Sequence, residues 1–134
     1  MINFLFSFSP LLRRLLCLFY LFVIIFLSLS PPSQFPEITL FPEADKIIHL
    51  LMYLGLGWLV MWAFFNIKLS KALRIFLLFS VPVWGVIMEL MQLCMNQGRY
   101  FSWFDILANF LGASLGVLIY RWIEKSWQYN CNKN

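Results

Sequence analysis

Charged residues and histidines are scarce in this chain. Only 12% of its 134 residues are charged, 62% are hydrophobic, and the sequence holds a single histidine, His49. A soluble domain carries about 25% charged residues and is about half apolar. A chain of this length exposes much of its surface, so it cannot hide such an excess in a core. The composition therefore excludes an ordinary soluble protein and predicts a single domain with lipid as its solvent.

Metal-binding and redox motifs are missing as well. The three cysteines, Cys17, Cys94 and Cys131, are odd in number and match no zinc or disulfide-exchange spacing. A lone histidine excludes the paired-histidine motif of zinc proteases. The net charge of +4 does not indicate nucleic acid, because the placement of Lys and Arg matters more than their sum in a membrane protein. From the sequence we expect no metal, no cofactor and no nucleic-acid partner.

Long apolar runs are what the sequence has in their place. A helix needs about 20 mostly apolar residues to cross a membrane. The segments that meet this length, or nearly do, are Leu11–Leu29, Lys46–Phe65, Ala72–Cys94 and Phe104–Ile123. We therefore predict an all-α membrane protein with four transmembrane helices. Its parts are an N-terminal segment with the first anchor (1–32), a proline-rich external loop (33–45), a three-helix core (46–123) and a cytoplasmic tail (124–134).

The first span has an alternative interpretation as a signal peptide. Arg13 and Arg14 precede a short apolar run, which is typical of a secretory signal. Pro31 directly follows the stretch "SLS" (28–30), and proline is a poor neighbour for a cleavage site. A retained anchor is therefore favoured, with the apolar first ten residues lying in the membrane interface.

Basic residues predict the direction of the spans. If the N-terminus is cytoplasmic, only Lys46 and Arg99 lie outside. The cytoplasmic set is then Arg13, Arg14, Lys68, Lys71, Arg74, Arg121, Lys125 and Lys133. This distribution agrees with the positive-inside rule and predicts that both termini are cytoplasmic.

Each of the last three spans carries one stripe of polar and small residues. Residues spaced by three or four share a helix face. The stripes are Lys46, His49, Tyr53 and Gly57; Gly85, Glu89, Gln92 and Asn96; and Asp105, Asn109, Gly112 and Gly116. Their ionisable members all lie in the outer half of the bilayer on the predicted topology. A carboxylate that faces lipid costs several kcal/mol, so the three stripes are expected to turn toward one another.

The expected polar network contains Asp45, Lys46, His49, Tyr53, Glu89, Gln92, Arg99, Asp105 and Asn109. Ala108, Gly112 and Gly116 form a pattern of small residues that favours close helix packing. Ser102 precedes Asp105 by three residues and is expected to cap the fourth helix. Pro82 is expected to kink or loosen the third span just below Glu89, and a kink there would widen the bundle beneath the polar layer. The first span lacks a polar stripe and is expected to be a peripheral anchor.

Two blocks of sequence resemble the VanZ-like family of small bacterial membrane proteins. "DKIIHLLMYLGLG" (Asp45–Gly57) is similar to the family's Asp-Lys, His and Tyr pattern. "GVIMELMQLCMNQGRYFSWFDILANFLGASLG" (Gly85–Gly116) is similar to its Glu, Gln, Gly-Arg, Ser, Asp, Asn and Gly pattern. The resemblance implies a multi-pass protein of the bacterial inner membrane with a role in the cell envelope. The family is named for an accessory protein of glycopeptide resistance, linked to teicoplanin, and the resemblance supplies no reaction.

Three functions remain open at this point. The first is an envelope-associated binding or accessory protein, not an enzyme, whose outer polar pocket takes an anionic lipid headgroup or a glycopeptide, with membrane lipids as further partners. The second is a membrane-embedded enzyme that acts on an envelope lipid or peptidoglycan precursor. Its candidate acid or base residues are Glu89, Asp105 and His49. The third is a small ion or proton carrier, although the sequence offers little polar path into the inner half.

Overall fold

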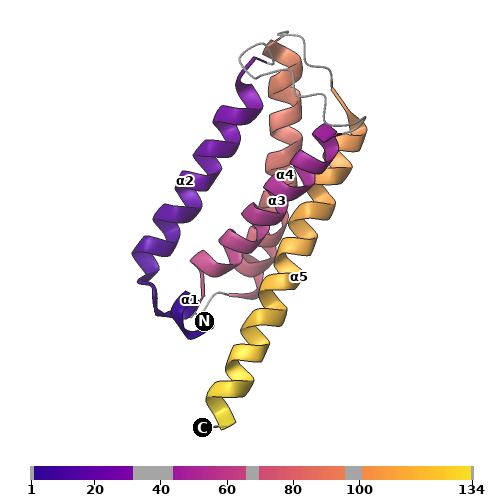
Figure 1. Cartoon of the computed structure of the whole chain (residues 1–134). Helices are drawn as coiled ribbons and strands as arrows, with labels where there is room; N and C mark the ends of the chain where they lie inside the picture. Colours follow the sequence, from indigo (N-terminus) through magenta and orange to yellow (C-terminus); the bar gives the residue numbers. More distant parts are fainter. Residues whose placement is uncertain (1, 32–43, 66–69, 96–100, 134) are drawn as a thin grey trace.

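The protein is all-helical in its computed structural model, which describes residues 2–31, 44–65, 70–95 and 101–133 (Figure 1). In chain order the helices are α1 (Ile2–Ser7), α2 (Pro10–Leu29), α3 (Ala44–Ala63), α4 (Lys71–Met95) and α5 (Trp103–Lys133). Helices α2 to α5 are each long and apolar enough to cross a membrane. The prediction of an all-α protein with four transmembrane helices is therefore confirmed.

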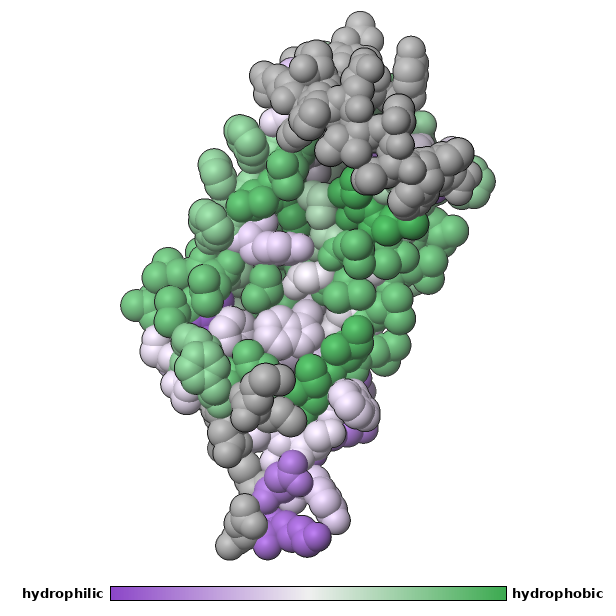
Figure 2. All heavy atoms as spheres, in the orientation of Figure 1, coloured by the Kyte–Doolittle hydropathy of each residue, from purple (hydrophilic) through white to green (hydrophobic). Residues whose placement is uncertain are grey.

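Most helix ends lie close to the predicted ones, and the end of α5 is the exception. The fourth span was expected to end at Ile123, whereas α5 continues to Lys133. Residues 124–133 contain no glycine or proline that would stop a helix. Figure 2 shows that apolar side chains cover most of the visible face, while hydrophilic ones gather at the C-terminal end of α5. The segment expected as a tail therefore begins as a polar extension of the last spanning helix.

Helices α3 and α5 form the centre of the bundle. Gly112 and Gly116 of α5 lie directly against the backbone carbonyls of Leu50 and Leu54 in α3. Both glycines belong to the small-residue stripe noted in the sequence, and Ala108 is buried one turn before them. Missing side chains let two helix backbones approach closely, which lipid-embedded helices use because they gain no hydrophobic burial from each other.

Helix α2 is joined to α3 and α4 by hydrogen bonds and by one fully buried side chain. Tyr20 Oη donates a hydrogen bond to the carbonyl of Met52 in α3 at 3.2 Å. Gln92 Nε2 of α4 donates to the carbonyl of Ser28 at 2.8 Å. Ile24 is fully buried in a core cluster with Tyr53, Leu56, Val81 and Ala113. The first span lacks a polar stripe of its own. It still donates a hydrogen bond to α3 through Tyr20 and accepts one from α4 through the Ser28 carbonyl.

The short helix α1 packs against the end of the bundle formed by the last turn of α3 and the second half of α5. The Phe6 ring lies 4.3 Å from the Phe65 ring and 4.8 Å from the Trp127 ring. Trp62 Nε1 donates a hydrogen bond to the carbonyl of Leu5 at 2.8 Å. The apolar start of the chain, expected in the membrane interface, is thus held by an aromatic cluster from α3 and α5.

Arg13 is buried at this end, where the sequence indicated only a cytoplasmic charge. Its side chain is 3% exposed, and Nη1 donates to the carbonyl of Trp62 at 3.2 Å. The guanidinium also lies over the Phe65 ring, 5.3 Å from its centroid. A cation at the C-terminal end of α3 is favoured by the partial negative charge of the last carbonyls.

We expect Arg13→Met to lower stability and Arg14→Met to have little effect. Hydrogen bonds from charged groups contribute about 1.5–3 kcal/mol, so loss of the Arg13 contact should cost about that much. Arg14 is exposed and has only a cation–π contact with Phe64 at 5.9 Å. Both variants remove one positive charge from neighbouring positions, so any effect of the lost charge on membrane insertion should be equal in the two. Thermal unfolding in detergent measures the difference, and equal midpoints would contradict the structural role of Arg13.

Candidate functional site

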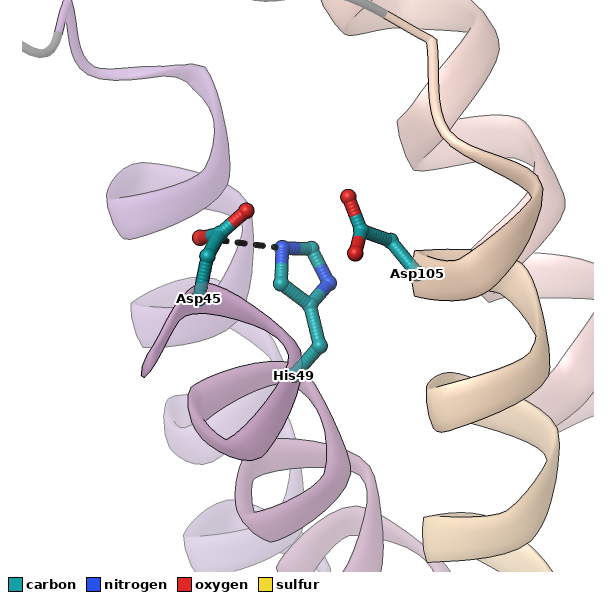
Figure 3. Close-up of side chains that lie close together, drawn as sticks. All are labelled: Asp45, His49 and Asp105. Carbon is teal, nitrogen blue, oxygen red and sulfur yellow. Dashed lines mark ion pairs between the residues drawn. The ribbon is translucent and has the colours of Figure 1, made fainter. Parts of the chain in front are cut away.

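Polar side chains from three helices meet at the outer end of the bundle, on the predicted topology. Asp45 and His49 come from the first turns of α3, Glu89 from the second half of α4, and Asp105 and Asn109 from the first turns of α5. In Figure 3 the His49 ring lies between Asp45 on one side and Asp105 on the other. We call these five residues the outer polar cluster. Four of them are buried, and only the Asp45 side chain is exposed.

His49 is the centre of the outer polar cluster. Its Nδ1 lies 3.1 Å from Asn109 Oδ1 and 3.8 Å from Glu89 Oε1, and its Nε2 lies 3.8 Å from Asp45 Oδ1. An amide oxygen only accepts hydrogen bonds, so the contact with Asn109 places a proton on Nδ1. In neutral His49 the lone pair is then on Nε2, on the side of Asp45.

Asp105 is positioned by the start of α5. Its backbone N–H donates to the Ser102 side chain at 3.3 Å, and the Ser102 carbonyl accepts from Asp105 and Ile106. Ser102 therefore caps α5, as its spacing from Asp105 indicated. The cap fixes the first turn and directs the Asp105 carboxylate, which is 7% exposed, toward His49 (Figure 3).

Several buried polar atoms of this region have no hydrogen-bond partner among the described residues. Glu89 is 1% exposed, and neither of its carboxylate oxygens has a hydrogen-bond partner within 3.5 Å among the described residues; the backbone N–H of Ser102 makes only a longer contact with it. Three further buried atoms have no hydrogen-bond partner among the described residues: Tyr53 Oη, Asn109 Nδ2 and Trp84 Nε1. Native proteins satisfy the great majority of their buried polar atoms, so a group of exceptions calls for an explanation. A network that served only to fix helix packing would pair these atoms with each other.

Gly85 explains how the second layer of polar residues fits. A Cβ atom at Gly85 would meet Asn109 Cβ at 3.0 Å and Tyr53 Cε1 at 3.1 Å. The absent side chain lets both residues pack against α4, one turn below Glu89. The glycine in the α4 stripe thus leaves the space that Asn109 and Tyr53 occupy.

Three further members of the expected network have other contacts or lie outside the described residues. Gln92 Nε2 donates a hydrogen bond to the carbonyl of Ser28 in α2. The Lys46 ammonium lies over the Phe104 ring, 5.2 Å from its centroid. Arg99 lies outside the described residues, so the near balance of charge indicated by the sequence stays a prediction.

An apolar groove of about 310 Å³ lies between α4 and α5, below the cluster. Its lining residues are Leu78, Phe79, Pro82, Phe110, Ala113, Ser114, Val117 and Leu118. Pro82 comes two turns before Glu89 on the same face of α4, and Ala113 comes one turn after Asn109 on the same face of α5. Pro82, expected to kink or loosen the helix, lies inside α4 and forms part of the groove wall. The groove and the outer polar cluster are therefore stacked along the same helix pair.

Pro82 indicated a wider bundle beneath the polar layer, but the sequence did not indicate the other residues of the groove or the roles of α2. A gap between two apolar helices leaves no mark in the hydropathy pattern. Arg13, Tyr20 and Ser28 contribute through partners on other helices, which a single span does not reveal.

Comparison with known proteins bears on the same residues. The sequence model of the VanZ/LLP1 family matches residues 8–124, which include α2 to α4, most of α5 and the whole outer polar cluster. Searches of curated proteins and of solved structures gave no match.

Proposed function

The chain belongs to the VanZ/LLP1 family, and we propose that it is a binding or accessory protein for an amphiphile of the bacterial cell envelope. It lies in the cytoplasmic membrane with both termini in the cytoplasm, as the distribution of basic residues favours. The amphiphile's headgroup contacts the outer polar cluster, and one of its acyl chains lies in the groove between α4 and α5.

The stacking of unsatisfied polar atoms above an apolar groove carries this proposal. Glu89 and Asn109 lie on the faces of α4 and α5 that continue into Pro82 and Ala113. An amphiphile has the same order of chemistry along its length, with a polar head at the membrane surface and a chain beneath. Ligand sites in general are largely apolar with a few convergent polar groups, and this arrangement has both parts.

Specificity comes from the polar part of this site. Lipid tails are as apolar as the groove, so an acyl chain gains no hydrophobic free energy by leaving the bilayer for it. A buried polar atom without a partner costs about 1–3 kcal/mol, which a hydroxyl, amine or phosphate of a headgroup recovers. The groove orients the molecule, and the cluster selects the headgroup.

An enzyme that acts on the same amphiphile is the second candidate. Glu89 Oε1 lies 3.8 Å from His49 Nδ1, and a carboxylate beside an imidazole is a common acid–base arrangement. A binding protein and an enzyme differ in the molecule that the site releases. A binding protein releases the lipid with its mass unchanged, whereas an enzyme of this kind yields a fragment or a transfer product.

We expect Ser114→Trp to reduce the amount of lipid that stays bound to the purified protein. Ser114 lines the groove, and an indole there occupies the space proposed for the acyl chain. Leu115→Trp is the matched control, because Leu115 is 43% exposed and lies outside the groove lining. A loss of about 1.4 kcal/mol lowers affinity tenfold, so the lipid-bound peak in native mass spectrometry should fall by about that factor.

Two results would count against the proposal. One is a wild-type protein that retains no lipid under conditions in which it stays folded. The other is equal lipid retention by Ser114→Trp and Leu115→Trp. The mass of the retained lipid identifies its headgroup class and shows whether it has been altered.

A further inference from the structure

We infer that Asp45, His49 and Asp105 bind one divalent transition-metal ion. One ligand atom from each of these residues lies within 4.8 Å of the other two. Asp45 and His49 stand one turn apart on α3, and Asp105 faces them from α5 (Figure 3). The site therefore joins the two helices that form the centre of the bundle.

The ligand atoms must move closer together before they can hold one ion. Zinc lies about 2.0–2.2 Å from nitrogen and oxygen ligands, so ligand atoms around a tetrahedral ion are about 3.3–3.6 Å apart. A separation of 4.8 Å closes to this value when the side chains approach one another by roughly 1.2–1.5 Å. Asp45 can make this movement, because its side chain is 69% exposed and lies in the first turn of α3.

Asn109 prepares His49 for metal binding. Its Oδ1 accepts the Nδ1 proton at 3.1 Å, which leaves the Nε2 lone pair on the side of Asp45. Metal-binding histidines almost always donate their second ring N–H to an oxygen in this way, and the partner fixes the tautomer and the ring orientation. Asn109 is thus a positioning residue that acts through His49.

Glu89 is an independent indication of a cation at this place. It is 1% exposed, its two oxygens have no hydrogen-bond partner within 3.5 Å among the described residues, and Oε1 lies 3.8 Å from the His49 ring. A buried carboxylate is stabilised by nearby positive charge. Asp45 and Asp105 add two more carboxyl groups to the same cluster. A divalent ion on Nε2 places further positive charge beside these three carboxyl groups.

The donor set defines the class of metal. One imidazole nitrogen with two carboxylate oxygens suits Zn²⁺ or Mn²⁺, whereas Ca²⁺ and Mg²⁺ prefer oxygen alone. Three protein ligands leave at least one coordination position open, as in catalytic zinc sites. If the proposed function holds, this position takes an anionic oxygen of the headgroup, which explains how an acid-rich cluster binds an anionic amphiphile. That last step rests on the proposed function, while the metal site rests only on the residues named here.

Titration with Zn²⁺ tests the site directly. The full-length protein is purified in detergent, stripped with EDTA and titrated by calorimetry, with Ca²⁺ as the comparison ion. We expect one Zn²⁺ per chain, a higher thermal midpoint with Zn²⁺ and no comparable effect of Ca²⁺. Asp45→Asn should weaken Zn²⁺ binding at least about tenfold without harming the fold, because Asp45 is exposed. Asn109→Ala should weaken it about 10–100-fold, the range found for residues that orient metal ligands.

Glu124→Gln is the control, since it removes a carboxylate from the opposite end of α5. Absence of Zn²⁺ binding by the folded wild-type protein would overturn the inference. Equal Zn²⁺ binding by wild type and Asp45→Asn would also overturn it, because the ion would then lie elsewhere, for example on the exposed thiol of Cys94. Lipid retention measured on the same samples separates the two proposals. If the protein binds zinc but retains no lipid, only the proposed function is contradicted. If it retains lipid regardless of EDTA treatment and binds no zinc, only the metal site is contradicted.

Discussion

Gly116→Ala should cause a large loss of stability, because it forces the two central helices apart. A Cβ atom at this position collides with the backbone carbonyl of Leu54 and comes within 2.9 Å of the Trp58 backbone nitrogen. Backbone atoms in the middle of α3 cannot rotate away as a side chain would. Overpacked cores lose about 1–3 kcal/mol and sometimes more, and a backbone collision belongs at the upper end of that range.

Gly55→Ala is the matched control for this variant. Its new Cβ atom meets Tyr20 Oη at 2.5 Å and Tyr20 Cζ at 2.9 Å, which are at the far end of a flexible side chain. Alanine gains about 1 kcal/mol over glycine within a helix, and this gain offsets loss of the hydrogen bond from Tyr20 to Met52. We therefore expect Gly55→Ala to unfold near the wild-type temperature. If Gly116→Ala is as stable as Gly55→Ala, close contact between α3 and α5 does not hold the bundle together.

The four spans could be predicted because lipid imposes a strong and local constraint. Every backbone polar group in the membrane core needs an internal partner, so a run of apolar residues of sufficient length folds as a helix. The ends of α2 are marked directly in the sequence by Pro10 at its first position, by Ser30 just after its last one, and by the proline-rich segment that follows. The same logic brought His49, Glu89 and Asp105 into one group, since each is a polar residue on an otherwise apolar helix.

Pairwise contacts could not be predicted, because they depend on how the helices rotate against each other. Gln92 shares a helix face with Glu89, yet the first contacts α2 while the second faces His49. Arg13 is a buried partner of Trp62 and not only a topology signal. The groove is lined by residues of both α4 and α5, so it depends on how the two helices pack together. The end of α5 was predicted too early because loss of apolar character ends a membrane span without ending the helix.

Substitutions in the outer polar cluster should change the stability of the bundle in a way that distinguishes a binding site from a packing network. Residues in a network that serves only for packing lower stability when they are removed. Residues that bind a ligand keep polar groups without partners in the ligand-free protein. Replacing such a residue by an apolar one can therefore raise the stability of the ligand-free protein. Glu89 and Gln92 lie three residues apart on α4 and are both buried, so they provide a comparison of these two situations.

We expect Glu89→Leu to raise the stability of the free protein and to abolish ligand binding. The substitution replaces a carboxylate that has no hydrogen-bond partner within 3.5 Å among the described residues with an apolar side chain of similar size. His49 keeps Asn109 at 3.1 Å and Asp45 at 3.8 Å, so no buried charge is left alone. Exchange of a whole buried ion pair for apolar groups is often neutral or stabilising by about 1–4 kcal/mol. We expect the same direction here, because Glu89 makes no hydrogen bond within 3.5 Å that the substitution would break and its 3.8 Å contact with His49 is long. Thermal unfolding of the EDTA-stripped protein in detergent measures the change, and native mass spectrometry measures lipid retention.

Gln92→Leu should have the opposite effect, because Gln92 is a satisfied structural residue. Its Nε2 donates to the Ser28 carbonyl at 2.8 Å, in the last turn of α2. Terminal carbonyls of a helix have no partner within it, so loss of this donor leaves a buried acceptor at a cost of about 1–3 kcal/mol. The two leucine variants should therefore move the unfolding midpoint in opposite directions. If both lower it by similar amounts, Glu89 belongs to the packing of the bundle, and the outer polar cluster loses its strongest argument for being a binding site.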